Sequence, residues 1–258
     1  MALADFSESL AYDAAFWLTG FEEPDGFEVE ELGRVSVDLC AKLRALAIIA
    51  LLVKGDSDKF LHSLIRSGRV RETFLMRLKH AGHQDEHHLA SGRLDGMLDA
   101  IASGDQSLAQ RIAWLSPRQF EAEREYEDDF CYAQILHRLV HGVAPIAAYG
   151  SLFDRFEAAL QGGTDARLEV ARALVGRSQL DFEQAFEALL EKRRLDNAAD
   201  IARAQIDEPQ ILAEREVFIE GLALLRLATS VGLETASDYL YCPAAARLPM
   251  RRPLPTGP

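Results

Sequence analysis

Apolar residues recur at helical spacing along almost the whole chain, and this periodicity constrains the fold more than any other feature. Runs with the strict alternation and the β-branched and aromatic residues of strands are essentially absent. Only four prolines precede residue 243, and each lies where a helix can begin or end: Pro24, Pro117, Pro145 and Pro209. The pattern therefore predicts an all-α fold.

Capping residues indicate where the helices begin and end. Gly55-Asp56 and Gly104-Asp105 each combine a helix-ending glycine with an N-cap aspartate, which is typical of a tight turn between two helices. Ser116-Pro117 is typical of a helix start. We expect helices over 2–19, 31–54, 57–67, 71–90, 92–103, 105–114, 117–141, 151–161, 165–176, 179–195 and 211–231.

The two glycine–aspartate turns resemble each other and favour stacked antiparallel helical hairpins around central apolar helices. Segment 35–54 is apolar on most faces and is expected to be one of the central helices. No linker of low-complexity composition divides the chain. We therefore predict one all-α domain of about ten helices over 1–242, followed by a Pro/Arg-rich tail over 243–258.

Composition and charge exclude several classes of protein. With 48% hydrophobic and 27% charged residues, the chain has the composition of a globular protein rather than a disordered one. Its 41 acidic residues against 28 Lys and Arg give a net charge of −13. Such a field repels phosphate backbones and anionic lipid, so we expect no direct binding to nucleic acid or to a membrane. A basic partner is favoured.

The sequence also predicts a cytoplasmic location. The longest apolar run, 45–53, is much shorter than the roughly 20 residues of a membrane span. Acids rather than basic residues occupy the first positions of the chain, unlike a secretory signal. Three widely spaced cysteines, Cys40, Cys131 and Cys242, are interpreted as free buried thiols of a reducing compartment.

Motifs for catalysis are largely missing. The sequence has no phosphate-binding glycine loop, no G-x-S-x-G and no H-E-x-x-H, and no cofactor is expected. Two histidine pairs have the i,i+4 spacing that places both rings on one helix face: His83 with His87, and His137 with His141. If their helices met, the four rings could bind a metal ion. We predict no metal site, and keep a helical metal-dependent hydrolase as the alternative.

Acidic residues are concentrated in two segments. Residues 1–33 hold nine carboxylates and no Lys or Arg, and 121–129 hold six acids in nine positions. Such clusters are either solvated helix starts, which the helix dipole favours, or a recognition surface for a cationic partner. The residues proposed for such a surface are Glu22, Glu23, Asp25, Glu28, Glu123, Glu125, Tyr126, Glu127, Asp128 and Asp129. The second segment is expected to contact the partner more directly, because a packed helix anchors it.

Glu220 is surrounded by apolar residues and is predicted to be a buried structural carboxylate. A buried carboxylate must be paired or hydrogen-bonded, or its pKa rises until it is neutral. The expected partners are Arg215, Arg226 or Arg247. Arg226, in the same apolar stretch, is likewise assigned a structural role.

Several of these segments resemble one protein family. Gly104-Asp105, EYEDDFCYAQILHRLV at 125–140, EREVFIEGLALLRLATSVGL at 214–233 and an end around Tyr239 and Arg247 are similar to the immunity protein 49 family of bacterial polymorphic toxin systems. The residues that match the family motif are Tyr126, Glu127, Asp128, Asp129, Phe130, Glu220 and Gly221. Phe130 and Gly221 are expected to serve packing.

The resemblance implies a non-enzymatic all-α antitoxin that binds a cognate secreted toxin, often one delivered by type VI secretion. The acidic charge of the chain further indicates that the toxin's own site binds a polyanion, as in a basic nuclease domain. Carboxylates of the immunity protein would then occupy the positions of the phosphates. A helical scaffold for a partner other than a toxin remains a third interpretation.

Overall fold

A computed structural model describes residues 3–23, 26–83, 87–142, 144–203 and 208–255. Its α-helices are α1 (Ser7–Glu22), α2 (Val29–Lys54), α3 (Ser57–Ala81), α4 (Asp95–Ser103), α5 (Gln106–Leu115), α6 (Glu127–Leu139), α7 (Gly150–Ala159), α8 (Ala166–Gly176), α9 (Gln179–Arg203), α10 (Pro209–Glu216) and α11 (Ile219–Ser230). Short 3₁₀ helices include η1 (Leu3–Phe6), η2 (His87–Leu89), η3 (Ile146–Ala148) and η4 (Ala244–Arg247). The prediction of an all-α fold is confirmed.

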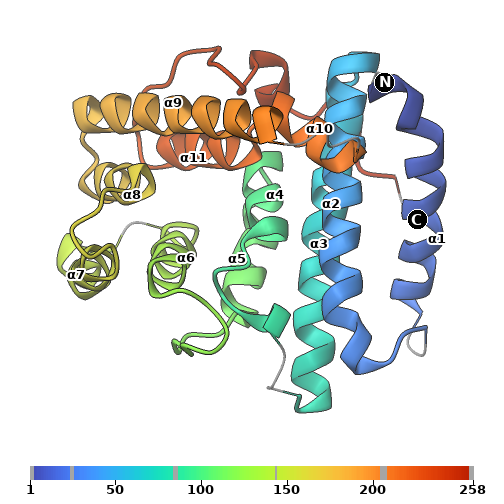
Figure 1. Cartoon of the computed structure of the whole chain (residues 1–258), viewed down its shortest axis with the longest axis horizontal. Coiled ribbons are helices and arrows are strands. Elements are labelled where there is room, and N and C mark those ends of the chain that lie inside the picture. Colours follow the sequence, from blue (N-terminus) through green and yellow to red (C-terminus); the bar gives the residue numbers. More distant parts are fainter. Residues whose placement is uncertain (1–2, 24–25, 84–86, 143, 204–207, 256–258) are drawn as a thin grey trace.

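The helices form one compact body. The long helices α1, α2 and α3 lie side by side at one end, and α6, α7 and α8 occupy the other end (Figure 1). The short helices α4 and α5 pack on α3 between these ends, while α9 and α11 run across the top. One continuous core of buried apolar side chains extends through the elements. Because α6 is held within this core, its N-terminal turn is presented from a rigid support.

Both predicted glycine–aspartate turns are confirmed. Gly55 and Gly104 adopt left-handed backbone conformations, with φ of 62° and 84°. Asp56 accepts a hydrogen bond from the Lys59 amide at 2.9 Å, and Asp105 accepts one from the Leu108 amide at 3.0 Å. These local motifs end one helix and begin the next within two residues, because glycine tolerates positive φ and aspartate satisfies a free amide.

Several predicted helix boundaries were wrong. The helices expected over 57–67 and 71–90 are one helix, α3, which continues because residues 67–71 are largely buried against α4. The helix expected over 211–231 is two, α10 and α11, because the extended Phe218 donates its amide to the Tyr241 carbonyl at 2.8 Å. Helix α9 runs on to Arg203 rather than ending near residue 195.

The helix predicted over 117–141 begins only at Glu127. Ser116 does not cap a following helix: its hydroxyl donates to the Ile112 carbonyl at 2.9 Å, at the end of α5. The Pro117 carbonyl accepts a hydrogen bond from the Gln134 side chain at 2.9 Å. Tertiary contacts therefore hold residues 116–126 as an irregular loop despite a favourable capping sequence.

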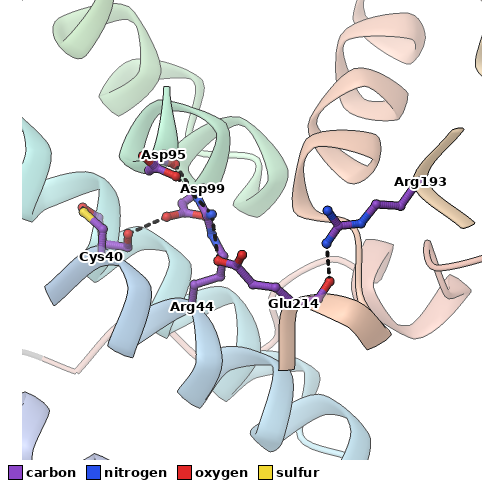
Figure 2. A network of polar contacts seen from close by, with 7 residues as sticks. Cys40, Arg44, Asp95, Asp99, Arg193 and Glu214 are labelled. Atoms are coloured by element: carbon purple, nitrogen blue, oxygen red, sulfur yellow. Dashed lines mark hydrogen bonds and ion pairs between the residues drawn. The ribbon is translucent and has the colours of Figure 1, made fainter. Parts of the chain in front are cut away.

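A buried polar network joins the two halves of the chain (Figure 2). The Arg44 guanidinium of α2 binds three carboxylates: Asp99 at 2.8 Å, Asp95 at 3.2 Å and Glu214 at 3.1 Å. Asp99 is fully buried, and burial raises its pKa to about 6 although Arg44 opposes the rise. Its other oxygen accepts a short hydrogen bond from Ser67 of α3. The network thereby fixes α2, α3, α4 and α10 against one another.

The segment after Pro243 lies against the first turn of α3. The Arg251 amide and the Arg252 side chain donate to Asp58 at 2.7 and 2.8 Å, and Arg252 also binds Asp56 at 2.6 Å. These bonds lower the pKa of Asp58 to about 2. Arg226 of α11 donates to the Arg247 carbonyl at 3.1 Å and so holds the start of this segment.

Candidate functional site

The acid-rich segment 121–129 leads from the irregular loop into the first turn of α6. Glu121, Glu123 and Glu125 lie in the loop, whereas Glu127, Asp128 and Asp129 form the first turn of the helix. Carboxylates at this end of a helix are stabilised by the unsatisfied amides and by the helix dipole. The local clustering of negative charge is therefore partly compensated by the backbone itself.

Two arginines from neighbouring helices pair with the three acids in the first turn of α6. Arg155 of α7 binds Glu127 at 2.7 Å. Arg167 of α8 binds Asp129 at 2.9 Å and lies 3.5 Å from Asp128. All five side chains are partly exposed, so each pair stabilises the fold by at most about 1 kcal/mol. Their main effect is to hold the first turn of α6 in one orientation.

Arg167 also connects this surface to the partly buried Glu220. Its guanidinium lies over the Tyr132 ring, and the Tyr132 hydroxyl donates to Glu220 at 2.8 Å. Burial raises the pKa of Glu220, which the hydrogen bond and Arg167 counteract. The structural role of Glu220 stays a prediction, and its hydrogen bond is made with Tyr132 rather than with the expected Arg215, Arg226 or Arg247. The true partner is 88 positions away in the sequence and only the fold brings it close.

Glu125 is fixed by the backbone of the loop before α4. One of its oxygens accepts a hydrogen bond from the Gly92 amide at 2.7 Å and another from the Ser91 hydroxyl at 3.2 Å. Burial raises the pKa of Glu125, and these two donors oppose the rise. The contact brings the acid-rich loop against the start of α4.

A surface hollow of about 510 Å³ lies where these segments meet. We call it the acidic hollow. Its lining includes two arginines, Arg93 and Arg124, and four carboxylates: Asp95, Glu123, Glu125 and Asp129. Tyr126 also lines the hollow with its side chain 79% exposed, and Glu123 is exposed beside it. In the part of the chain that the structure describes, no ion pair or hydrogen bond engages the Glu123 carboxylate. The site presents a free carboxylate and a free aromatic ring on a braced support.

Comparison with known families decides what kind of protein carries this surface. The model of the family described as immunity protein 49 matches residues 62–246, which is well over half of the chain. The chain belongs to the immunity protein 49 family. No curated protein and no solved structure matches it.

Membership of the immunity protein 49 family implies an immunity role and a cognate toxin as partner. The matched region begins within α3 and ends in η4, so it contains the whole acidic hollow but leaves out α1 and α2. Of the residues assigned to packing, Phe130 is buried, and a Cβ on Gly221 would lie 2.6 Å from Phe218 and 2.7 Å from the Cys242 sulfur. The close approach of α11 to the chain end requires glycine at this position.

The N-terminal acids lie apart from the hollow. Glu22, Glu23 and Glu28 are exposed around the turn between α1 and α2, and none of them lines the acidic hollow. Arg77 of α3 holds this turn by donating to the carbonyls of Phe21 and Phe27, both at 3.2 Å. Asp25 lies outside the described residues. The structure thus does not bring the two acid-rich segments into one site.

The histidines that could bind a metal are also dispersed. His83 follows α3 and His87 begins η2, whereas His137 is buried in α6 and His141 follows that helix. Among the described residues, no group of three or more His, Cys, Asp or Glu side chains could hold a metal ion. The histidine spacing that suggested a metal site was local, and the fold does not make the two pairs converge.

The thiols are not activated. Cys40, Cys131 and Cys242 are all buried, as predicted, and burial raises their pKa values to about 12, 11 and 12. The nucleophilic form of cysteine is the thiolate, which these environments disfavour at neutral pH.

Among the described residues, no helix is both long enough and apolar enough to cross a membrane.

His137 makes a pH-dependent contribution to stability that can be measured. Burial, with Arg71, His141 and Arg118 nearby, lowers its pKa from 6.5 to about 3. Between these values the unfolded chain binds a proton that the folded protein does not, so stability falls with falling pH by about 1.4 kcal/mol per unit. We expect His137→Gln to lose this component between pH 6 and 4, as measured by urea unfolding. His80→Gln, at an exposed histidine of α3, should keep the pH profile of the original protein. If His137→Gln keeps that profile as well, the assignment is contradicted.

Proposed function

We propose that this immunity protein neutralises its toxin by binding it directly, without catalysis, and that the acidic hollow is the centre of the contact surface. The observation that carries the proposal is Tyr126, an aromatic residue that is 79% exposed near the free Glu123 carboxylate. Tyrosine is enriched at interface hot spots, because it gives a large contact area at a low cost in conformational entropy. An exposed tyrosine on a rigid, charged site supports recognition rather than core packing.

The charge of the site supports a cationic partner. Four carboxylates converge on the hollow, against two arginines, in a protein with a net charge of −13. A toxin that binds nucleic acid has a site lined with Lys and Arg, so carboxylates held in a fixed geometry would replace phosphates there. We therefore propose a nuclease as the toxin class, inhibited by occlusion of its nucleic-acid site.

Family membership supports a bacterial setting for the protein and its toxin. The toxin would be one that bacteria secrete, for instance through a type VI apparatus, and the immunity protein would act in the cytoplasm of the producing cell and its kin. Its own chain would contact neither nucleic acid nor membrane, because its net negative charge repels both.

The proposal is tested by co-expression with the toxin domain encoded beside this gene. The immunity protein should restore growth, form a complex with the purified toxin, and inhibit cleavage of DNA or RNA by it. The variant Glu123→Lys should lose protection, whereas Glu191→Lys, at an exposed acid of α9 whose only described ion pair is with Arg194, should retain it. Protection by Glu123→Lys equal to that of the original protein would contradict the assignment of the acidic hollow.

Association with the toxin should depend strongly on salt. Raising the ionic strength from about 0.01 M to 0.15 M shortens the Debye length from about 30 Å to about 8 Å. Because long-range attraction between the acidic protein and a basic toxin increases the encounter rate, stopped-flow association rates should fall by about tenfold or more over this range. Dissociation rates should change much less. An association rate independent of salt would show that the carboxylates do not steer binding.

A further inference from the structure

A second hollow, of opposite character, lies between the end of α5, the start of the following loop and the C-terminal half of α6. It has a volume of about 650 Å³, and its polar lining residues are Arg118, Gln134, His137, Arg138 and His141. We call it the cationic pocket. Its lining contains no carboxylate. In a protein with a net charge of −13, two arginines and two histidines gathered without acids are an unusual arrangement that the acidic hollow does not explain.

The two arginines are held by contacts that leave their charge uncompensated. The Arg118 guanidinium lies 4.7 Å from the centre of the Trp114 ring, and the Arg138 guanidinium lies 5.8 Å from the centre of the Tyr149 ring. Arg138 also donates to the Ala148 carbonyl. Within the described part of the chain, neither arginine forms an ion pair with a carboxylate. Both guanidiniums are therefore oriented by aromatic rings and retain N–H groups for an anion.

The cationic pocket and the acidic hollow lie along one surface. Between them is a third hollow of about 310 Å³, whose apolar side chains include Leu75, Leu78 and Leu89. This middle hollow shares Arg118 with the cationic pocket and Arg124 with the acidic hollow. The surface along the loop 116–126 thus runs from the acidic hollow, through a middle hollow lined by both apolar and charged side chains, to the cationic pocket. A partner that covers the acidic hollow with basic residues would reach the cationic pocket with its neighbouring residues.

We propose that the cationic pocket receives a carboxylate side chain of the toxin, so that the immunity protein binds a toxin surface on which an acidic residue lies near the basic residues that cover the acidic hollow. Arginine suits this role, because its planar fork of donors matches the two oxygens of a carboxylate. The exposed Trp114 and the adjacent Arg118 are the residue types that most often dominate binding energy at interfaces. The proposal rests on the proposed function for the identity of the partner, but the carboxylate specificity of the pocket can be tested without a toxin.

The test uses Trp114 as a fluorescent reporter. The chain has two tryptophans, so Trp17→Phe leaves Trp114 as the only tryptophan, with the Arg118 guanidinium over its ring, and selective tryptophan excitation reports on it alone. A hexaglutamate peptide is titrated into this variant, with hexaserine as the uncharged control. We expect a saturable change in emission with hexaglutamate alone. Because the remaining surface repels anions, binding of this peptide should be confined to the cationic pocket.

Two variants decide whether the pocket is responsible. The double substitution Arg118→Gln and Arg138→Gln should weaken hexaglutamate binding by about tenfold or more, since charge-assisted hydrogen bonds are lost. Arg172→Gln should have no effect, because Arg172 is already paired with Glu157 and Glu169 on α7 and α8. The loss of Arg118 from above the Trp114 ring could itself change the emission of Trp114. Binding is therefore also measured by calorimetry, and thermal unfolding verifies that the double variant folds. No saturable binding, or equal binding by the double variant, would overturn the proposal. Saturation by inorganic phosphate at a lower concentration than by hexaglutamate would also overturn it, in favour of a phosphate site.

The toxin then separates this inference from the proposed function. If the toxin binds the original protein and binds the double variant about tenfold more weakly, both are supported. If the toxin binds both proteins equally, the cationic pocket is not part of the interface and the inference is overturned while the proposed function stands. If the toxin does not bind the original protein, the proposed function fails, and the peptide titration alone decides whether the pocket binds carboxylates.

Discussion

Replacing Arg44 by alanine is expected to lower the free energy of unfolding by about 3–5 kcal/mol, which is the usual cost of removing one partner from a buried ion pair. The substitution would leave Asp99 fully buried, with Ser67 as its remaining donor, and would bring Asp95 and Glu214 together without a cation between them. For a domain of this size, such a loss should reduce the melting temperature by roughly 10 °C. Chemical denaturation and thermal unfolding both measure it.

A matched arginine provides the control. Arg194 pairs with Glu191 on the surface of α9, where both side chains are about half exposed. Exposed pairs of this kind contribute about 0–1 kcal/mol, so Arg194→Ala should barely change stability. A similar small loss for Arg44→Ala would show that the network in Figure 2 does not hold α2, α4 and α10 together.

Replacing Tyr126 by alanine is expected to weaken toxin binding by about 30-fold or more, which corresponds to a hot-spot loss of about 2 kcal/mol. Its ring is 79% exposed in the free protein, so its removal should change stability by no more than about 0.5 kcal/mol. Weakened binding together with an unchanged melting temperature would identify Tyr126 as a contact residue rather than a packing residue, whereas tight binding by the variant would contradict the prediction. Surface plasmon resonance with the purified toxin measures the affinity.

Tyr12 offers a matched control for this experiment. It is a tyrosine on α1 with its side chain 73% exposed, and it lies outside the region matched by the family model. Tyr12→Ala should leave toxin affinity unchanged. A larger loss for Tyr12→Ala than for Tyr126→Ala would move the proposed contact surface from the acidic hollow to the N-terminal helix.

Ion pairs within the chain hold the acids in the first turn of α6 in place. Arg155 and Arg167 engage Glu127, Asp128 and Asp129, so these acids already have partners within the chain. Their side chains are pre-ordered, which reduces the entropy lost on binding. The pairs also leave Glu123 and Tyr126 as the groups with most freedom to make new contacts. We therefore expect substitutions at these two positions to affect affinity more than substitutions at Asp128.

The elements predicted well from the sequence are those specified by neighbouring residues. The turns at Gly55 and Gly104 form as expected, because positive φ and an N-cap carboxylate are local requirements. The all-α class follows from a periodicity that no tertiary contact needs to create. The predicted helix start at Ser116-Pro117 was wrong for the converse reason. Hydrogen bonds to Ile112 and Gln134, rather than the local capping sequence, determine the conformation there.

The sequence by itself therefore determined the helical class, the tight turns, the buried thiols and the position of the acid-rich segments, since each depends on residues close together in the chain. Only the tertiary structure decided which charges are compensated and which remain free. The pairing of Glu220 with Tyr132 joins residues 88 positions apart, and that of Glu214 with Arg44 joins residues 170 positions apart. The loop between α5 and α6 is likewise shaped by packing, and it separates the acidic hollow from the cationic pocket. Contacts over such distances arise from the arrangement of whole helices, because local spacing contains no information about which of two distant helices will be neighbours.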